Sequence, residues 1–262
     1  KSFGALSLTF NPKYRKAFAP LVEKVSFASF GDIDSLRSVI DEDTAFIILE
    51  PVQGESGIIV APDGFLQEVR KLCDEKGIIL IFDEIQAGLG RTGRLWAGEH
   101  WNTVPDILCL AKGIAGGVPM GATLVRPDIL ASISKGEHSS TFGGNPISCA
   151  AGIAALTAIT EDGLIENSKK MGELFKEGLE KLKEKHTMIR EIRGKGLMIG
   201  IELKFEVKNI LMELIEEGVL MLYSGRNILR ILPPLVITEE DVTKVLGALD
   251  VVISKEEEKK NV

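Results

Sequence analysis

The chain has 262 residues, of which 45% are hydrophobic and 26% are charged, proportions that are ordinary for a globular protein with a substantial core. Its net charge of −7 and the lack of a basic cluster argue against nonspecific binding to nucleic acid or acidic membranes. No apolar run approaches the roughly 18 residues of a membrane span, and the first residues show no signal-peptide pattern. We therefore expect a cytoplasmic protein with no membrane or nucleic-acid partner.

The cysteines and histidines give no sign of a disulfide or a metal site. Cys73, Cys109 and Cys149 are odd in number, widely spaced and surrounded by apolar residues, as are small core residues in a reducing compartment. The three histidines share no metal-ligand spacing with them or with one another. We therefore expect no metal ion.

Taken in chain order, residues 1–160 predict alternating strands and helices. Residues 25–30 predict a short strand, and 32–40 a helix capped by Asp32 or Asp34. Short runs rich in β-branched residues are typical of strands buried on both faces of a parallel sheet, here 45–50, 78–82 and 106–111. A helix over 64–75 suits a βαβ crossover, and a further strand follows at 122–125. A helix is expected over 147–159.

Residues 161–262 predict a smaller domain of mixed type. The composition changes near 161–163, after which 164–185 has the pattern of one long amphipathic helix. Further elements are expected as strand, bend and strand over 189–203, a helix over 207–217, strands over 219–222 and 228–232, a helix over 239–253 and a frayed charged tail over 255–260. The sequence therefore predicts a large α/β domain (1–160) with a mostly parallel sheet and a small α+β domain (161–262).

Two charged residues follow directly on buried strands. Asp83 closes the run 78–82, and Lys112 closes the run 106–111. Ligands of open α/β sheets gather at the carboxyl ends of strands, so both side chains can face one crevice. A buried lysine has a lowered pKa and becomes a nucleophile toward carbonyl groups, and a nearby carboxylate could keep a pyridinium nitrogen protonated, as pyridoxal phosphate requires. A structural salt bridge is the alternative, and the two residues alone favour it.

A glycine pattern between these residues matches the dinucleotide-binding fingerprint. Gly88, Gly90 and Gly93 have the spacing G-x-G-x-x-G. That fingerprint requires the first glycine to follow the strand directly and the last to open a helix. Here other residues follow the strand, and 94–98 has no helical periodicity. We therefore interpret the segment as a loop and reject a nicotinamide site.

The surrounding residues closely resemble the signature of class III (subgroup II) aminotransferases. The resemblance rests on Phe82-Asp83-Glu84-Ile85-Gln86, Arg91-Thr92-Gly93, Pro105-Asp106-Ile107 and Ala111-Lys112-Gly113. It implies pyridoxal-phosphate fold type I, the fold of aspartate aminotransferase. It also implies that Asp83 bonds the pyridine nitrogen, that Ile85 packs on the ring and that Gln86 reaches the phenolic oxygen. Lys112 would hold the cofactor covalently and act as the catalytic residue.

Three further residues receive roles from the same resemblance. Hydroxyls and amides before the helix at 147 suit a phosphate or a plain helix cap, and in the family the position of Thr141 binds the cofactor phosphate of the neighbouring subunit. This implies a homodimer with shared active sites. Arg230 lies among apolar strand residues and needs an anion. The resemblance makes it the ligand of a substrate carboxylate, with Glu55 as its partner in the empty site.

Within the family, the segments 139–146 and 230–235 look most like acetylornithine aminotransferases. The implied reaction moves the terminal amino group of N-acetylornithine to 2-oxoglutarate, giving a semialdehyde and glutamate in arginine or lysine biosynthesis. Similar enzymes act on lysine or ornithine precursors bound to an acidic amino-group carrier protein, which is therefore an alternative partner. Ornithine δ-aminotransferase and 4-aminobutyrate aminotransferase are alternatives.

The resemblance begins inside the family's sequence. The portion before it would carry an aromatic residue that stacks on the cofactor and a glycine-rich phosphate-binding turn, and Lys1 would align with an arginine that grips the distal carboxylate of the substrate. A hypothesis of another class follows from this observation. The chain could be a non-catalytic fragment or an interaction subunit that retains the fold.

Overall fold

The structure is a computed structural model that describes residues 2–260, with the backbone alone for residue 260. Contacts divide the chain into two units, residues 1–45 and 46–262. The first unit contains three helices, α1 (Phe3–Ser7), α2 (Pro12–Arg15) and α3 (Ile33–Val39), and a 3-10 turn, η1 (Lys16–Phe18). The predicted cap of α3 is confirmed, because the Asp32 carboxylate accepts from the backbone N–H groups of Asp34 and Ser35.

The strand predicted over 25–30 is wrong. These residues have no regular secondary structure. The backbone N–H of Ser29 donates to the Ser35 hydroxyl instead of to a partner strand. The Phe27 ring packs edge-on against Phe10, and the guanidinium of Arg15 lies over it. Phe27, one of the apolar residues that suggested a strand, thus packs as a single side chain against residues from an earlier part of the first unit.

The second unit begins with a four-stranded sheet in the order β1-β4-β5-β6. Its strands are β1 (Phe46–Leu49), β4 (Ile79–Asp83), β5 (Ile107–Leu110) and β6 (Ala122–Val125). The first three are parallel and β6 is antiparallel, so the predicted, mostly parallel sheet is confirmed. Helix α4 (Phe65–Lys76) lies between β1 and β4 in the sequence, and it buries Leu66 and Val69 completely. The chain passes from β4 to β5 through a loop whose one regular element is the 3-10 turn η2 (Ala97–Trp101).

Asp106, immediately before β5, fixes the end of the sheet at which β4 and β5 begin. It is 6% exposed, and its carboxylate accepts from the backbone N–H of Leu80 at 2.8 Å and from Arg70 at 2.9 Å. Arg126, directly after β6, binds its other oxygen. One buried carboxylate thus connects residues next to or within β4, β5 and β6. It thereby helps to set the register that places the opposite ends of β4 and β5.

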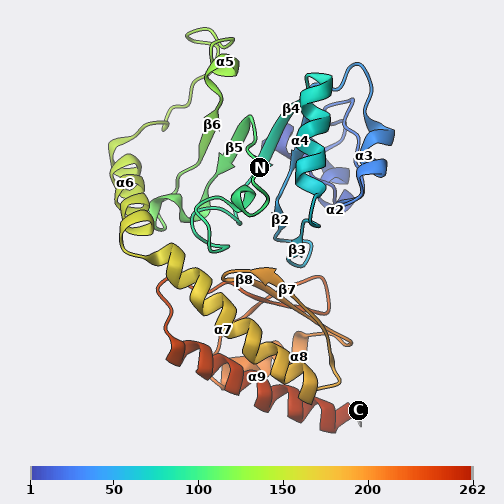
Figure 1. Cartoon of the computed structure of the whole chain (residues 1–262), viewed down its shortest axis with the longest axis vertical. Coiled ribbons are helices and arrows are strands. Elements are labelled where there is room, and N and C mark those ends of the chain that lie inside the picture. Colours follow the sequence, from blue (N-terminus) through green and yellow to red (C-terminus); the bar gives the residue numbers. More distant parts are fainter. Residues whose placement is uncertain (1, 261–262) are drawn as a thin grey trace. The chain divides into compact units, whose positions relative to one another are not determined.

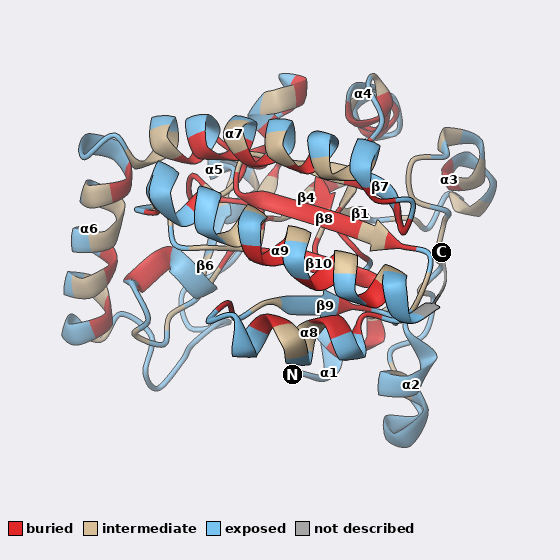
Figure 2. Cartoon of the chain, turned by 90° about the horizontal axis from the view of Figure 1, so that it is seen from below, coloured by how far each residue is buried: buried red, intermediate tan, exposed pale blue. Residues whose placement is uncertain are grey.

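A second, antiparallel sheet has the order β7-β8-β10-β9. Its strands are β7 (Ile189–Lys195), β8 (Met198–Leu203), β9 (Leu222–Ser224) and β10 (Ile228–Ile231), and its helices are α7 (Leu164–Lys185), α8 (Lys208–Glu216) and α9 (Glu239–Lys260). Strand β9 begins later than the predicted 219–222. Helices α7 and α9 lie side by side against this sheet (Figure 1). Strands β8 and β10 are almost completely buried, β9 at the edge is largely exposed, and the helices are buried on their inner faces (Figure 2).

The charged tail predicted after residue 253 is wrong, because α9 continues to Lys260. Two of its acids face the protein. Glu256 is 2% exposed, and Glu257 accepts from the backbone N–H of Met188 at 2.8 Å and lies 2.9 Å from Nδ1 of His186. The last turns of α9 are thus fixed by polar contacts with the start of β7, which sequence periodicity does not show.

Helix α6 (Pro146–Glu161) confirms the helix predicted over 147–159, and the Asn145 side chain caps its first turn. The remaining elements are α5 (Pro127–Leu130), η3 (Lys112–Ala115) and a small hairpin of β2 (Val52–Gln53) and β3 (Ile59–Val60). In the described part of the chain, no helix alone has the length and apolar composition to cross a membrane. Helices α6 and α7 together satisfy both criteria, with a bend of 61° between them.

Candidate functional site

The ends of β4 and β5 place two predicted site residues on one edge of the first sheet. Asp83 is the last residue of β4, and it pairs with Cys109 of the parallel strand β5. The next residue extends the ladder, since the backbone N–H of Glu84 donates to the carbonyl of Cys109 at 3.0 Å. Lys112 begins η3 just beyond β5. Asp83 and Lys112 thus both lie at the edge of the sheet where β4 and β5 end, as the sequence predicts.

Lys112 has an unusual backbone and a perturbed amine. Its φ of +50° lies in the left-handed region, which lysine seldom occupies. Desolvation is the main reason that its pKa is lowered, although the charges of Glu55, Asp83 and Glu50 oppose the shift. The expectation of a buried lysine is wrong for this single chain, because the residue is exposed. A lowered pKa still favours the neutral, nucleophilic amine.

An ion pair connects the second sheet to the hairpin loop after β2. Arg230 in β10 is 7% exposed and donates from Nη1 to Glu55 Oε1 at 2.8 Å, which confirms the predicted pairing. Its Nε is buried without a hydrogen-bond partner. Gln86 Nε2 donates to the same Glu55 oxygen at 3.2 Å. Glu55 thus brings together residues from β10 and from the segment after β4.

Glu50, which the sequence-based assignment did not include, also faces this region. It follows β1, and its carboxylate accepts from the backbone N–H of Gly54 at 2.9 Å. Burial raises its pKa, and the charge of Asp83 raises it further, against the hydrogen bond from Gly54. The sequence does contain a signal for Glu50, because the predicted buried strand over 45–50 ends in this acid, as the strand before Asp83 does. Gly54 has a steric role, because a Cβ there would lie 2.5 Å from the Gln86 side chain.

The remaining predicted residues lie apart from this cluster or contact it through the backbone. Ile85 is half-buried, and its N–H donates to Asp83 Oδ1 at 3.0 Å. Thr141 lies exposed in the turns before α6, and among residues 2–260 no hydrogen bond connects it to the other proposed site residues. Lys1, with its predicted role at the distal carboxylate, lies outside the described residues.

The glycine-rich segment after β4 is a loop, as the sequence predicts, and side chains hold it at both ends. The carboxylate of Glu84 accepts from the backbone N–H groups of Ala97 at 2.7 Å and Gly98 at 2.9 Å. Burial raises the pKa of Glu84 to about 7. Arg91 donates to the carbonyls of Leu197, in the turn between β7 and β8, and of Pro233, just after β10. The sequence analysis included Arg91 in the family signature but gave it no role, because its partners lie more than 100 residues away.

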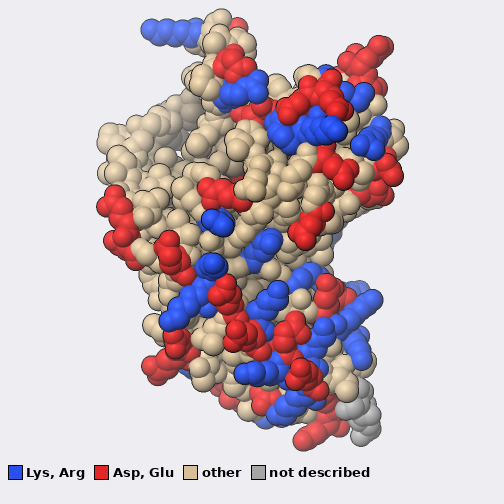
Figure 3. Space-filling model, in the orientation of Figure 1, with Lys and Arg blue, Asp and Glu red and all other residues tan. Residues whose placement is uncertain are grey.

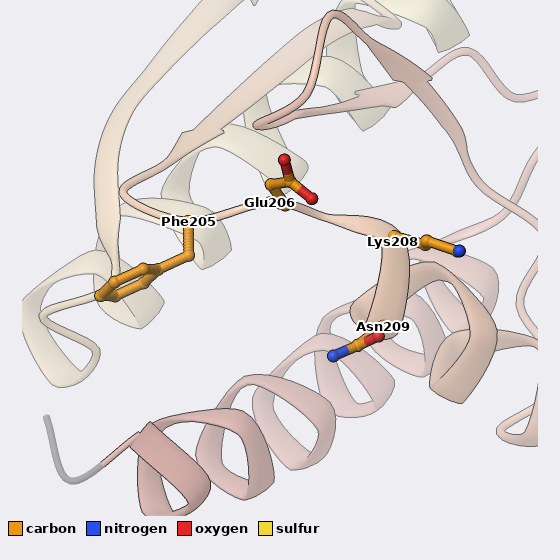
Figure 4. A pocket seen from close by; sticks show the side chains of 4 residues that line it. All are labelled: Phe205, Glu206, Lys208 and Asn209. Atoms are coloured by element: carbon orange, nitrogen blue, oxygen red, sulfur yellow. The ribbon is translucent and has the colours of Figure 1, made fainter.

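A separate hollow of about 280 Å³ lies at the start of α8 and is lined by Phe205, Glu206, Lys208 and Asn209. Figure 4 shows Phe205 and Lys208 pointing in opposite directions, and none of the predicted site residues lines this hollow. The surface over α7 and α9 carries charges of both signs, without a continuous basic patch on the face that Figure 3 shows. The residues at and near the ends of β1, β4 and β5, together with Glu55 and Arg230, therefore remain the candidate active site. We call them the strand-end cluster: Glu50, Glu55, Asp83, Gln86, Lys112 and Arg230.

Comparison with known proteins shows the family to which the chain belongs. The family profile of class III aminotransferases matches residues 1–253. The acetylornithine aminotransferase of Caldanaerobacter subterraneus is 45% identical over 256 residues, which are 97% of this chain and 65% of that protein. The chain thus spans slightly less than two thirds of the length of this relative.

Two solved structures show the same fold. An ornithine aminotransferase from Toxoplasma gondii superposes with a TM-score of 0.95 at 33% identity, covering 100% of this chain and 63% of that one. That structure has partial occupancy of pyridoxal phosphate at its active site. An acetylornithine aminotransferase from Elizabethkingia anophelis has a TM-score of 0.82 at 38% identity, covering 86% and 61%. The predicted fold class is confirmed, and the chain belongs to the class III aminotransferases, a family of pyridoxal-phosphate-dependent enzymes of fold type I.

Proposed function

We propose that the protein is a transaminase that moves the terminal amino group of N-acetylornithine to 2-oxoglutarate. The observation that carries this proposal is the buried Arg230, paired with Glu55 close to the strand ends that bear Asp83 and Lys112. A buried guanidinium needs an anion, and a substrate carboxylate can replace the exposed Glu55 side chain. Residues 1–160 would form the cofactor domain and 161–262 the small domain.

The residues around the strand ends fit pyridoxal phosphate by their chemistry. The cofactor offers an aldehyde, a basic ring nitrogen and a phenolic oxygen. The cluster offers a lysine of lowered pKa, the carboxylate of Asp83 and the amide of Gln86. Ile85 supplies an apolar side chain beside them. When bound, the cofactor supplies an electron sink for the carbon that bears the amine.

The proposed roles follow from the position of each residue. The neutral amine of Lys112 would hold the cofactor and would be released when the donor amine takes its place. Once free, it would take the proton from the substrate carbon next to the nitrogen. Asp83 would accept a hydrogen bond from the protonated ring nitrogen. Arg230 binds the carboxylate of glutamate or 2-oxoglutarate by charge-assisted hydrogen bonds, and Glu55 neutralises Arg230 when no such carboxylate is present.

The choice of amino donor rests on the relatives. Those of highest similarity include enzymes named acetylornithine aminotransferase, at 44–45% identity, and one named ornithine aminotransferase, at 42%. Ornithine, 4-aminobutyrate and lysine or ornithine precursors on an acidic carrier protein are alternative donors. A cytoplasmic location belongs to the same proposal and is supported by the three free cysteines.

We also infer a homodimer in which Thr141 reaches the cofactor phosphate of the neighbouring subunit. Thr141 is exposed, and apolar side chains near it are exposed too: Phe142 by 81%, Ile147 by 76% and Ile153 by 68%. Exposed apolar patches of this kind are typical of protein interfaces. Sedimentation of the wild-type chain and of Ile153→Glu tests the inference. A dimer that dissociates in the variant supports it, and a wild-type monomer contradicts it.

The visible absorption spectrum of the chain with pyridoxal phosphate tests the cofactor site. We expect a band that is absent in Lys112→Ala, present in Lys71→Ala, and bleached by glutamate. Lys71 is a suitable control because it is an exposed lysine on α4. Turnover of N-acetylornithine, ornithine and 4-aminobutyrate is then compared. A band that does not depend on Lys112, or no band at all, contradicts the proposal and favours a non-catalytic fragment or interaction subunit.

A further inference from the structure

The loop between β2 and β3, residues 54–58, lies against the second sheet. Three of its backbone carbonyls accept hydrogen bonds from side chains of three different strands. These bonds are Arg230 Nη1 to Gly54 O at 3.3 Å, Ser224 Oγ to Glu55 O, and Arg193 Nε to Gly57 O at 2.8 Å. The main chain on both sides of the Glu55 side chain is thus attached to β7, β9 and β10.

The fourth strand makes room for this loop. Gly200 in β8 pairs with Arg193 on one side and with Arg230 on the other. A Cβ at Gly200 would lie 3.1 Å from both the Gly57 carbonyl oxygen and the Ile58 Cβ, closer than such contacts usually are. Because Gly200 has no side chain, the loop over 54–58 can lie directly on the sheet between Arg193 and Arg230.

Burial and hydrogen bonding restrict the rest of the loop as well. The backbone N–H of Gly54 is bound by Glu50, and Ile58 is completely buried. By contrast, the Glu55 side chain is 74% exposed although its main chain is held. A ligand that displaces the Glu55 carboxylate from Arg230 can therefore do so by rotation of one side chain.

We propose that Ser224 and Arg193 are positioning residues that hold Glu55 beside Arg230 and thereby set how strongly Glu55 competes with a substrate carboxylate. The inference rests on the proposed role of Arg230. Ser224 is 4% exposed, and its hydroxyl is bound to the main chain of Glu55 itself. A fixed main chain keeps the Glu55 carboxylate at a high effective concentration at the guanidinium. Loss of the hydrogen bond from Ser224 makes the Glu55 carboxylate a weaker competitor for Arg230. It leaves Arg230 itself in place.

The test measures the affinity of the chain loaded with pyridoxal phosphate for glutarate, a dicarboxylate without an amine, by calorimetry. Ser224→Ala is expected to bind glutarate about threefold to tenfold more tightly, the range that one neutral hydrogen bond supplies. In a Glu55→Gln background, Ser224→Ala should change the affinity by less than twofold, because the competing charge is already removed.

A matched control separates this effect from general loosening of the fold. Ser168 is completely buried, and its hydroxyl donates to the carbonyl of Arg91 at 3.0 Å, away from Glu55. Ser168→Ala should therefore leave glutarate affinity unchanged. Equal affinity of Ser224→Ala and wild type, or the same change in both backgrounds or in the control, overturns the inference.

Hydrogen exchange gives a readout that needs no ligand. Amides of residues 54–58 should exchange faster in Ser224→Ala than in wild type, and unchanged exchange refutes the anchoring role. The two proposals fail in different ways. If wild type binds no glutarate, or if Arg230→Met binds glutarate with the same affinity as wild type, the proposed function fails. If Arg230→Met abolishes binding and Ser224→Ala has no effect, only the anchoring role fails.

Discussion

Replacing Asp106 by asparagine should destabilise the first sheet of the second unit strongly. The Asp106 carboxylate is 6% exposed and serves three donors, Arg70, Arg126 and the backbone of Leu80. Asparagine has nearly the same volume, so packing changes little. It removes the negative charge, however, and turns one acceptor into a donor that faces an arginine.

The magnitude follows from what remains after the change. Breaking a buried ion pair by removal of one partner costs about 3–5 kcal/mol. Asparagine keeps one oxygen for the Leu80 N–H, and Arg70 keeps its contact with Asp74 at 2.6 Å. We therefore expect the lower end of that range, a loss of about 3 kcal/mol in the free energy of unfolding.

Denaturation by urea at neutral pH measures this loss, with Asp128→Asn as the matched control. Asp128 binds the same Arg126 through two hydrogen bonds but is 62% exposed. Solvent screens exposed pairs, so the control should differ little from wild type. Equal losses in the two variants would refute the argument that burial makes the Asp106 carboxylate important.

Three further predictions concern pH and packing. Because burial raises the pKa of Glu84 from 4.5 to about 7, the stability from its neutral form is present below pH 4.5 and is lost as the pH rises through 7. The unfolding free energy of wild type should therefore fall between pH 5 and 8 relative to Glu84→Gln, and parallel profiles would contradict this. Hydrogen bonds from Lys185 and His186 lower the pKa of Asp250, so its contribution is present above its ordinary pKa of 3.8 and is lost as the pH falls through the lower value in the fold. The thermal midpoint of His186→Asn should consequently fall less steeply in acid than that of wild type, and equal slopes would count against the pair. Phe175 is completely buried in the core of the second sheet, so Phe175→Ala should cost about 3–5 kcal/mol in urea denaturation, and a loss below about 1 kcal/mol would contradict that burial.

Continuous apolar runs made much of the fold predictable. The runs that form β1, β4 and β5 are short and rich in β-branched residues, and their ends bear the acids and the lysine of the candidate site. The amphipathic repeat of α7 predicts its bounds, Leu164–Lys185, because most residues on its buried face are apolar and recur at helical spacing. Periodicity is informative where a whole face of an element is buried against its neighbours.

The features that the sequence did not reveal depend on contacts between distant residues. The last turns of α9 resemble a solvated tail, but Glu257 reaches the start of β7 across about 70 positions. Ser224 is a short polar residue at a strand end, and its partner Glu55 lies 169 positions away. Neither residue has a local signal, since its role arises when two segments pack together.

The backbone of Lys112 has an energetic consequence. A side chain in the left-handed region costs about 1–2 kcal/mol, whereas glycine adopts the same conformation without that penalty. Selection for stability alone would thus favour glycine at this turn. A lysine here therefore lowers stability, as Lys24 does with its φ of +57°. At Lys112 this backbone coincides with an amine whose pKa is lowered by desolvation, beside the charges of Glu55, Asp83 and Glu50.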